Sequence, residues 1–183
     1  MNKDHFLEEV AVKQKNTLNR ILYCLSWVVM IGSGAIALLN FSALTSGLSQ
    51  GGVYWPSLLI ALVCGAIAVY TFLIKDKILT EYEYTFTNGA LDFAEVYNNK
   101  KRKSLGSLNV RNVESFGKVS GEQFRRYVNM PGIKRMNWFL NREAELYYFY
   151  FTKDSDRKMI IFEPSEEMTE TIKLYLPRGA FQE

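Results

Sequence analysis

Two long uncharged stretches decide the fold: ILYCLSWVVMIGSGAIALLNFSAL at 21–44 and YWPSLLIALVCGAIAVYTFLI at 54–74. No Asp, Glu, Lys, Arg or His occurs from Ile21 to Ile74, a run of 54 residues. A transmembrane helix needs about 20 apolar residues to cross roughly 30 Å of hydrocarbon. We therefore predict two spans, about 21–44 and 54–74. The mean hydropathy of −0.08 resembles that of a soluble protein only because the charges lie elsewhere.

The orientation of these spans follows from the basic residues around them. The connecting segment 45–52, TSGLSQGG, is small, polar and glycine-rich, which predicts a turn, and it has no basic residue. The basic residues that flank the spans on the other side are Lys3, Lys13, Lys15, Arg20, Lys75 and Lys77. The positive-inside rule then predicts a multi-pass protein of the cell membrane with both termini in the cytoplasm. A cleaved signal peptide is disfavoured, because 21–44 exceeds a typical apolar signal region and no small-x-small site follows it.

The segment 1–20 admits two interpretations. Phe6, Leu7, Val10 and Ala11 have helical spacing, so a short amphipathic helix at the inner interface is one. The favoured one is a partly ordered cytoplasmic lead-in, because the apolar face is weak and the charge is mixed.

The interior of the spans gives two further indications. Neither span contains a charged residue, which argues against a transporter or a pump for this chain alone. Gly32, Gly34 and Gly65 could let the two helices approach closely, although glycine is also simply common in membrane helices.

Residues 76–183 are predicted to form one small cytoplasmic domain. Apolar and polar side chains alternate from residue 82, as in a strand, and Asn88-Gly89 is the strongest short signal for a hairpin turn. Further strands are expected to 97 and near 102–108, 113–119, 145–152 and 158–162. The segment 121–142 is interpreted as a long loop with a short helix or strand. A helix from Ser165, its N-cap, to Leu176 ends the domain.

This order of elements resembles the pleckstrin-homology-like (PH-like) barrel, in which a helix plugs one end of two packed antiparallel sheets. The resemblance is carried by YTFTNGAL at 84–91, the strand Leu146–Phe151 and the helix Ser165–Leu176. The chain is similar in particular to bacterial proteins of unknown function that join a two-span membrane hairpin to such a domain. The expected fold class is therefore an α+β membrane protein. It consists of a transmembrane hairpin at 21–75 and a PH-like antiparallel β-barrel or sandwich with a C-terminal helix at 76–183.

Basic residues are concentrated at 98–135, which contains ten basic residues and two acidic ones. The candidate residues for binding anionic lipid or a partner are Lys100, Lys101, Arg102, Lys103, Arg125, Arg126, Lys134 and Arg135. Lys100 to Lys103 fall in the turn before the third expected strand, where each would gain about 1 kcal/mol beside an anionic leaflet. The competing interpretation is a solvated loop that only satisfies the positive-inside topology. PH-like relatives that bind phosphoinositides often use basic residues in early strand loops, but this sequence shows no resolved form of that motif.

The sequence contains few of the residues and motifs that catalytic sites use. His5 is the one histidine, and Cys24 and Cys64 both lie inside the uncharged run, so His-rich metal sites, a Ser-His-Asp triad and a disulfide framework are not expected. No P-loop, dinucleotide, nucleophile-elbow or zinc-protease motif occurs. We expect no enzymatic activity, no metal and no cofactor. Nucleic acid is not expected either, because the domain is nearly neutral overall and lacks a recognisable nucleic-acid motif.

The sequence thus predicts a non-catalytic, membrane-anchored binding or scaffold protein. Its cytoplasmic PH-like domain would engage a protein partner or the anionic inner leaflet. The alternative is an accessory subunit of a larger membrane complex, related to transport or the envelope, that acts through its transmembrane helices. Candidate partners are the bilayer, anionic lipid headgroups, a membrane or cytoplasmic protein, and another copy of the chain.

Overall fold

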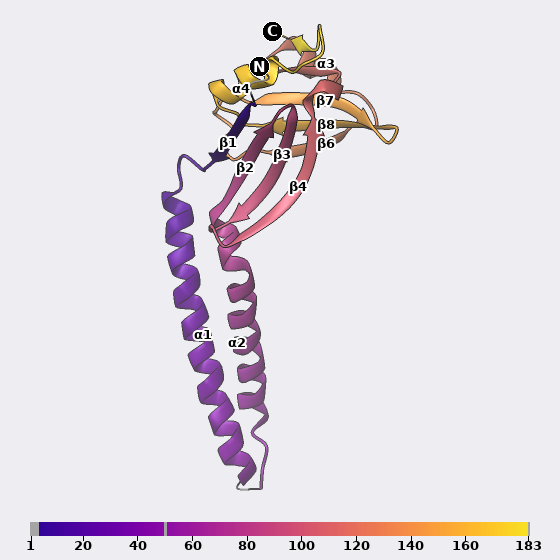
Figure 1. The fold of residues 1–183 in the computed structure, drawn as a ribbon. Coiled ribbons are helices and arrows are strands. Elements are labelled where there is room, and N and C mark those ends of the chain that lie inside the picture. Colours follow the sequence, from indigo (N-terminus) through magenta and orange to yellow (C-terminus); the bar gives the residue numbers. More distant parts are fainter. Residues whose placement is uncertain (1–3, 50, 183) are drawn as a thin grey trace. The chain divides into compact units, whose positions relative to one another are not determined.

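The structure is a computed structural model that describes residues 4–49 and 51–182. The chain divides into two compact units, one of residues 15–80 and one of the residues up to Gln14 together with those from Glu81 onward. The first unit is helical and the second is mainly β-structure (Figure 1). In the order of the chain, the helical unit is therefore inserted between the first and second strands of the β unit. The described part of segment 1–20 up to Gln14 accordingly belongs to the β unit, not to a separate lead-in.

The helical unit contains α1 (Thr17–Ser49), α2 (Trp55–Ile74) and the 3-10 helix η1 (Lys75–Leu79). Both α1 and α2 are long and apolar enough to cross a membrane, as the pattern of 21–44 and 54–74 predicts. At 1.5 Å per residue, α2 matches the hydrocarbon thickness of about 30 Å, whereas α1 is longer than that thickness requires.

The prediction of a turn from residue 45 is wrong, because α1 continues to Ser49. Within this polar stretch, hydroxyl groups donate to carbonyls one turn back in the helix: Thr45 Oγ1 to Ser42 O at 2.8 Å, and Ser49 Oγ to Ser46 O at 2.7 Å. Gln50, within the expected turn, lies outside the described residues.

Only one of the singled-out glycines faces the other helix closely. A Cβ at Gly65 would lie 4.0 Å from the Cβ of Ala37, while Cβ atoms at Gly32 and Gly34 would meet nothing within 4 Å. Close packing through glycine thus involves Gly65, whereas Gly32 and Gly34 fit the other interpretation, that glycine is simply common in membrane helices.

The first sheet of the β unit has the order β1-β2-β3-β4. Its strands are β1 (Phe6–Ala11), β2 (Thr80–Thr87), β3 (Ala90–Tyr97) and β4 (Lys101–Asn109). Neither interpretation of the N-terminal segment is right, since it is an antiparallel edge strand beside β2. Asn88 and Gly89 have φ of 50° and 99°, which confirms the predicted turn between β2 and β3.

The second sheet has the order β6-β8-β7-β5-β9. Its strands are β5 (Ser115–Lys118), β6 (Lys134–Trp138), β7 (Tyr147–Lys153), β8 (Asp156–Phe162) and β9 (Phe181–Gln182). The strand expected near 113–119 is β5, which has crossed from β4 through η2 (Val110–Asn112) into this sheet. The segment 121–142 holds both α3 (Glu122–Val128) and β6.

The α+β class is confirmed, but closure into an all-antiparallel barrel is not. Among the described residues the two sheets are separate, and both β6–β8 and β5–β9 are parallel. They share one buried core with α4 (Glu166–Lys173), whose Met168 and Ile172 are fully buried. Ser165 Oγ accepts from Met168 N at 3.1 Å, which confirms the predicted N-cap.

The outer face of the second sheet carries a smaller apolar cluster. On α3, Phe124 and Tyr127 pack against Tyr148 and Tyr150 of β7. The inner face of the same strand enters the shared core through Phe149. β7 is therefore covered on both sides, as its unbroken apolar pattern predicts.

Candidate functional site

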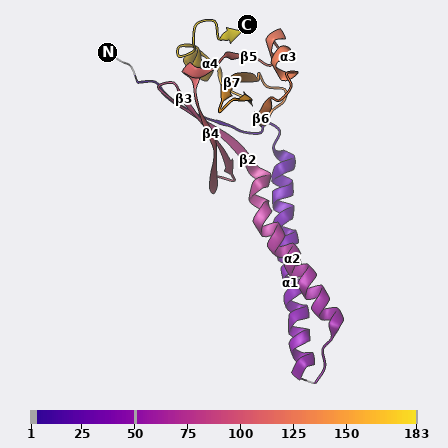
Figure 2. The same ribbon diagram turned by 90° about the vertical axis from the view of Figure 1, so that its right-hand side faces the viewer.

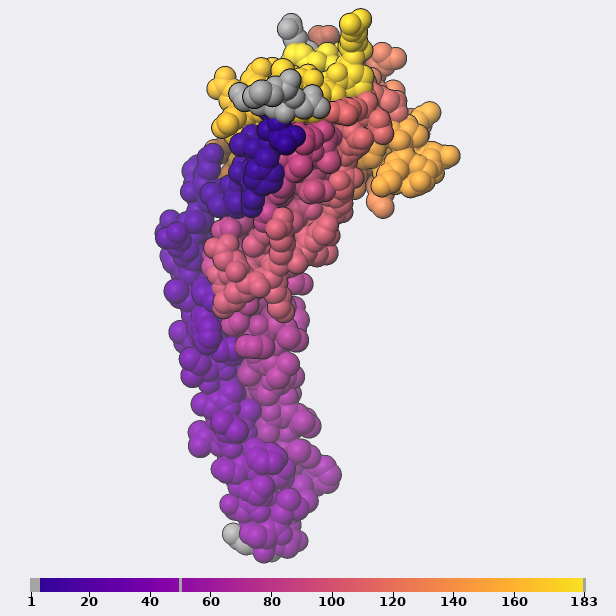
Figure 3. Space-filling model, in the orientation of Figure 1, coloured from indigo at the N-terminus to yellow at the C-terminus, as the bar shows by residue number. Residues whose placement is uncertain are grey.

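The turn between β3 and β4 carries the first group of predicted basic residues. Asn98 and Asn99 have φ of 49° and 52°, the conformation of a two-residue type I′ turn. Lys100 N donates to Tyr97 O at 2.9 Å, and Lys101 is the register partner of Tyr97. The turn is thus tight and places its lysines at the end of the sheet. Residues near 100 lie on the molecular surface (Figure 3).

Successive residues at the start of β4 point to opposite faces of the sheet. Arg102 reaches across its register partner Val96 to form an ion pair with Glu83 of β2. Burial raises the pKa of Glu83, and the guanidinium of Arg102 opposes that rise. Arg102 therefore has a structural partner on one face. Lys101 and Lys103 are exposed on the other face.

The face that carries Lys101 and Lys103 is also aromatic. Tyr97 is opposite Lys101, and Glu95 is opposite Lys103. The Tyr97 hydroxyl donates to Glu95 Oε2 at 2.6 Å, and this bond raises the pKa of Tyr97 to about 12. Tyr82 of β2 lies near the same carboxylate, and burial raises its pKa. Half-buried phenols and exposed ammonium groups thus share one surface.

We call Tyr82, Tyr97, Lys100, Lys101 and Lys103 the hairpin tip. Because the Asn88-Gly89 turn joins β2 to β3, the hairpin tip lies at the end of the first sheet where β2 begins. Ala11, the last residue of β1, is the register partner of Tyr82 at that same end. Both connections to the helical unit therefore leave the sheet beside the hairpin tip. They are short, since residues 12–16 precede α1 and the five residues of η1 follow α2.

The remaining predicted basic residues lie elsewhere. Arg125 and Arg126 are exposed on α3, and Lys134 and Arg135 are exposed on β6. The strand β6 belongs to the second sheet, and α3 covers the outer face of that sheet. The structure therefore separates the eight predicted residues into two groups instead of joining them in one site.

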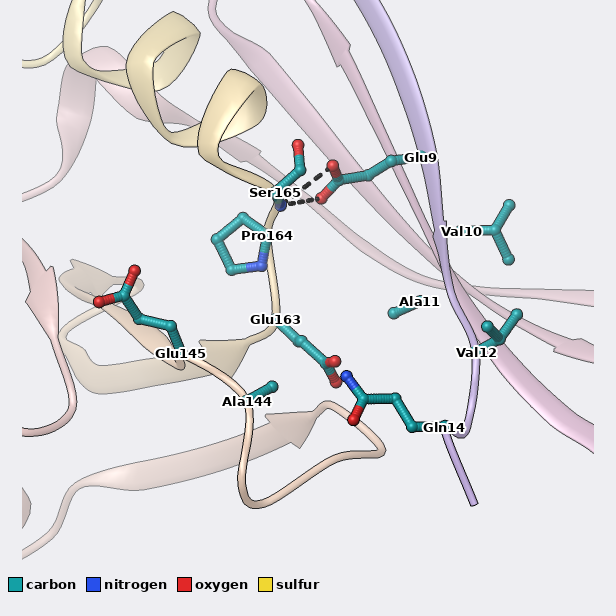
Figure 4. Close-up of a pocket in the computed structure, with 10 residues that line it drawn as sticks. All are labelled: Glu9, Val10, Ala11, Val12, Gln14, Ala144, Glu145, Glu163, Pro164 and Ser165. Atoms are coloured by element: carbon teal, nitrogen blue, oxygen red, sulfur yellow. Dashed lines mark hydrogen bonds between the residues drawn. The ribbon is translucent and has the colours of Figure 1, made fainter. Parts of the chain in front are cut away.

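A cavity of about 390 Å³ lies elsewhere in the β unit, and sequence reasoning missed it. It is lined by β1 and the residues after it, the segment before β7, and the connection from β8 to α4 (Figure 4). Both carboxylate oxygens of Glu9 lie 3.1 Å from Ser165 N, so Glu9 accepts from the first turn of α4. A carboxylate at this position also complements the positive end of the helix dipole.

Asn141 ties the N-terminal segment to the rest of the β unit. Its Nδ2 donates to Val12 O and to Glu163 Oε1, both at 2.8 Å, and its Oδ1 accepts from Gln14 N at 2.9 Å. Glu9 and Glu163 of the cavity are thus engaged, together with Asn141, in holding β1 and the residues after it in place. Among residues 4–49 and 51–182, no three His, Cys, Asp or Glu side chains are grouped as metal ligands would be. The geometry is that of a structural contact that fixes the N-terminal segment to the rest of the β unit.

The ionisation of Glu9 should make stability depend on pH. Burial raises the pKa of Glu9 above its ordinary value of 4.5, although the bonds from Ser165 oppose the rise. The folded state then binds more protons than the unfolded state, so unfolding free energy should fall as pH rises through and just above 4.5. Glu9→Gln should lack this part of the decline.

Urea unfolding of the full chain in nanodiscs, from about pH 4 to 7, measures the difference. Glu122→Gln is the control, because it removes an exposed carboxylate from α3, which packs on the second sheet and not on the sheet of β1. A Glu9→Gln curve parallel to that of the parent protein at every pH would contradict the assignment.

Comparison with known proteins finds one protein family whose model matches almost the whole chain. The model of a family described as Bacterial PH-like domain (DUF6106) matches residues 3–182, so the match includes both apolar helices as well as the β unit. No curated protein and no solved structure matches the chain.

Proposed function

The chain belongs to the Bacterial PH-like domain family (DUF6106), and from this we propose that it is a non-catalytic, membrane-anchored binding protein that applies its hairpin tip to an anionic leaflet. In this proposal α1 and α2 span the cell membrane, and both termini and the β unit are cytoplasmic. Basic residues before α1 and after α2 support that orientation.

The observation that carries the proposal is the position of the hairpin tip within the β unit. The two connections to α1 and α2 leave the sheet at the end where Lys100, Lys101 and Lys103 are found. Electrostatic attraction to a leaflet decays over a Debye length of about 10 Å. Short connections keep these lysines within a range at which each can gain about 1 kcal/mol.

The aromatic part of the hairpin tip supports the same target. Tyrosine is enriched at membrane interfaces because its ring is apolar and its hydroxyl is polar. The Tyr97 hydroxyl is held by Glu95, so the ring has a fixed orientation beside Lys101. A surface of this kind suits the headgroup region better than bulk water. It supports a general anionic surface as ligand in preference to one stereospecific headgroup.

A fluorescent probe on the turn tests this contact in the full chain. Asn99→Cys is labelled after Cys24 and Cys64 have been replaced by alanine, and the protein is placed in nanodiscs with or without phosphatidylglycerol. Headgroup-labelled quencher lipids should quench the probe more strongly when phosphatidylglycerol is present, and salt should reduce the effect. Removing both charges by Lys101→Gln and Lys103→Gln should cost about 2 kcal/mol of attraction, roughly a thirtyfold loss of contact.

Arg125→Gln with Arg126→Gln is the matched control, because it removes two charges from α3 and leaves the hairpin tip intact. Its quenching should equal that of the parent protein. Equal quenching in the lysine variant would instead show that these residues are only solvated, and the proposal would fail.

A further inference from the structure

A second basic surface lies on the outer face of the second sheet. On β8, Met159 and Ile161 pack in the cluster under α3, and by strand alternation Arg157 projects to that same face. Arg135 of β6 is the register partner of Met159 and shares the face. The helix α3 covers part of this outer face, and Arg126 is an exposed residue of that helix. We call Arg126, Arg135 and Arg157 the arginine face.

An aromatic pair attaches α3 to the sheet that carries Arg135 and Arg157. The ring of Tyr127 from α3 stacks on Tyr150 of β7, with centroids 4.3 Å apart and planes at 22°. Tyr150 of β7 is the register partner of Met159 of β8, which in turn is the register partner of Arg135 of β6, so the stack is two strands away from Arg135. Tyr150 is buried, so the stack fixes α3, and with it Arg126, on the outer face of the sheet.

The neighbouring charges leave this region basic. Lys134 of β6 and Lys158 of β8 are register partners, so two like charges are adjacent on the inner side of the same strands. Such a pair disfavours folding and is a cost to the sheet itself. The acidic residues near this face include Glu122, which is exposed one turn before Arg126 on α3, and Glu114, which accepts from Thr152, the register partner of Arg157, at 2.6 Å.

The arginine face and the hairpin tip occupy opposite ends of the β unit. In both views α3 lies at one end of the β unit and the β3–β4 turn at the other (Figures 1 and 2). The β7–β8 turn beside Arg157 protrudes at the surface as an orange lobe (Figure 3). If the hairpin tip contacts the leaflet, as in the proposed function, the arginine face cannot contact it at the same time. This step rests on the proposed function and favours a ligand outside the membrane.

We propose that the arginine face binds an acidic segment of a partner protein. Guanidinium groups pair with carboxylates through two parallel hydrogen bonds, which suits them to Asp and Glu side chains. One basic end of the β unit then serves the membrane and the other serves a partner.

A labelled polyglutamate peptide and the full chain in neutral-lipid nanodiscs test this inference by fluorescence anisotropy. Arg126→Gln with Arg135→Gln should weaken peptide binding by about tenfold. Arg126→Lys with Arg135→Lys should give an intermediate affinity, because it keeps the charge and loses the paired geometry. Lys101→Gln with Lys103→Gln should leave peptide binding unchanged, and the arginine variant should leave quenching of the Asn99→Cys probe unchanged.

Three results would overturn the inference. Equal affinity of the arginine variant and the parent would mean that these side chains only solvate the sheet and protect the edge strand β6. Loss of peptide binding in the lysine variant would place the peptide at the hairpin tip. Loss of peptide binding when phosphatidylglycerol is added would identify the arginine face as a membrane surface. The last two results would still leave the probe assay to judge the proposed function separately.

Discussion

Replacing residues 13–80 with Asn-Gly is expected to release the β unit as a folded, water-soluble protein. Ala11 is opposite Tyr82 in the antiparallel register, so Val12 and Glu81 form the next pair and a two-residue turn closes them. The fused chain retains the bonds from Ser165 N to Glu9 and from Asn141 to Val12. Trp138 becomes its one tryptophan, packed 4.7 Å from Phe93, and reports urea unfolding by fluorescence.

The matched comparison is the fragment 81–183, which lacks β1. It should lose about 3 kcal/mol relative to the fused chain, since burial of a leucine contributes about 2 kcal/mol and a helix cap about 1. The side chains lost are Leu7 and Ala11, which pack on the core, and Glu9, which accepts from α4. A typical domain has only 5–15 kcal/mol in total, so the fragment should be largely unfolded in mild urea. Equal midpoints for the two proteins would show that β1 is dispensable.

Local patterns in the sequence were sufficient for part of this architecture. The two apolar helices, the Asn88-Gly89 turn and the Ser165 cap depend on residues within a few positions of one another. These elements can therefore be predicted without knowledge of the tertiary contacts. The doubly covered strand β7 belongs to the same class, because its run of apolar residues is itself the signal.

The N-terminal strand was not predictable in the same way. The strand β1 pairs with β2, and the two apolar helices separate these strands in the sequence. Glu9 faces inward between Leu7 and Ala11, and a carboxylate there breaks the alternation that would mark a strand. Glu9 faces inward because its carboxylate accepts a hydrogen bond from Ser165 N, near the other end of the chain. The parallel pairing of β6 with β8 likewise depends on tertiary contacts that no local pattern encodes.

The candidate site was predictable in composition and not in arrangement. All eight predicted basic residues are in the described part of the chain, but Arg102 is engaged with Glu83 and the others divide between two ends of the β unit. Arg157 and Lys158 were not singled out because they lie outside the dense segment 98–135. Only the register of β6 with β8 brings them beside Lys134 and Arg135.

Phe162→Ala is expected to destabilise the β unit by about 3–5 kcal/mol, the usual cost of removing a buried aromatic ring. Phe162 is fully buried, and its ring centroid lies 5.4 Å from that of Tyr84 in the first sheet and 5.1 Å from that of Phe149 in the second. The ring therefore joins the sheet that carries the hairpin tip to the sheet that carries the arginine face. Phe162→Leu should cost about 1–2 kcal/mol, because most of the volume is kept.

Urea unfolding of the fused β unit measures both variants, with Leu174→Ala as the control at a side chain that is 71% exposed. The control should change the unfolding free energy by less than about 0.5 kcal/mol. Because Phe162 contacts both sheets, Trp138 fluorescence and the circular dichroism of the sheets should report one shared transition at a lower urea concentration. Two separate transitions in the parent chain would mean that the sheets fold independently. The two binding surfaces would then have no fixed relation to each other, so this measurement also tests the geometry on which a two-ended binding module depends.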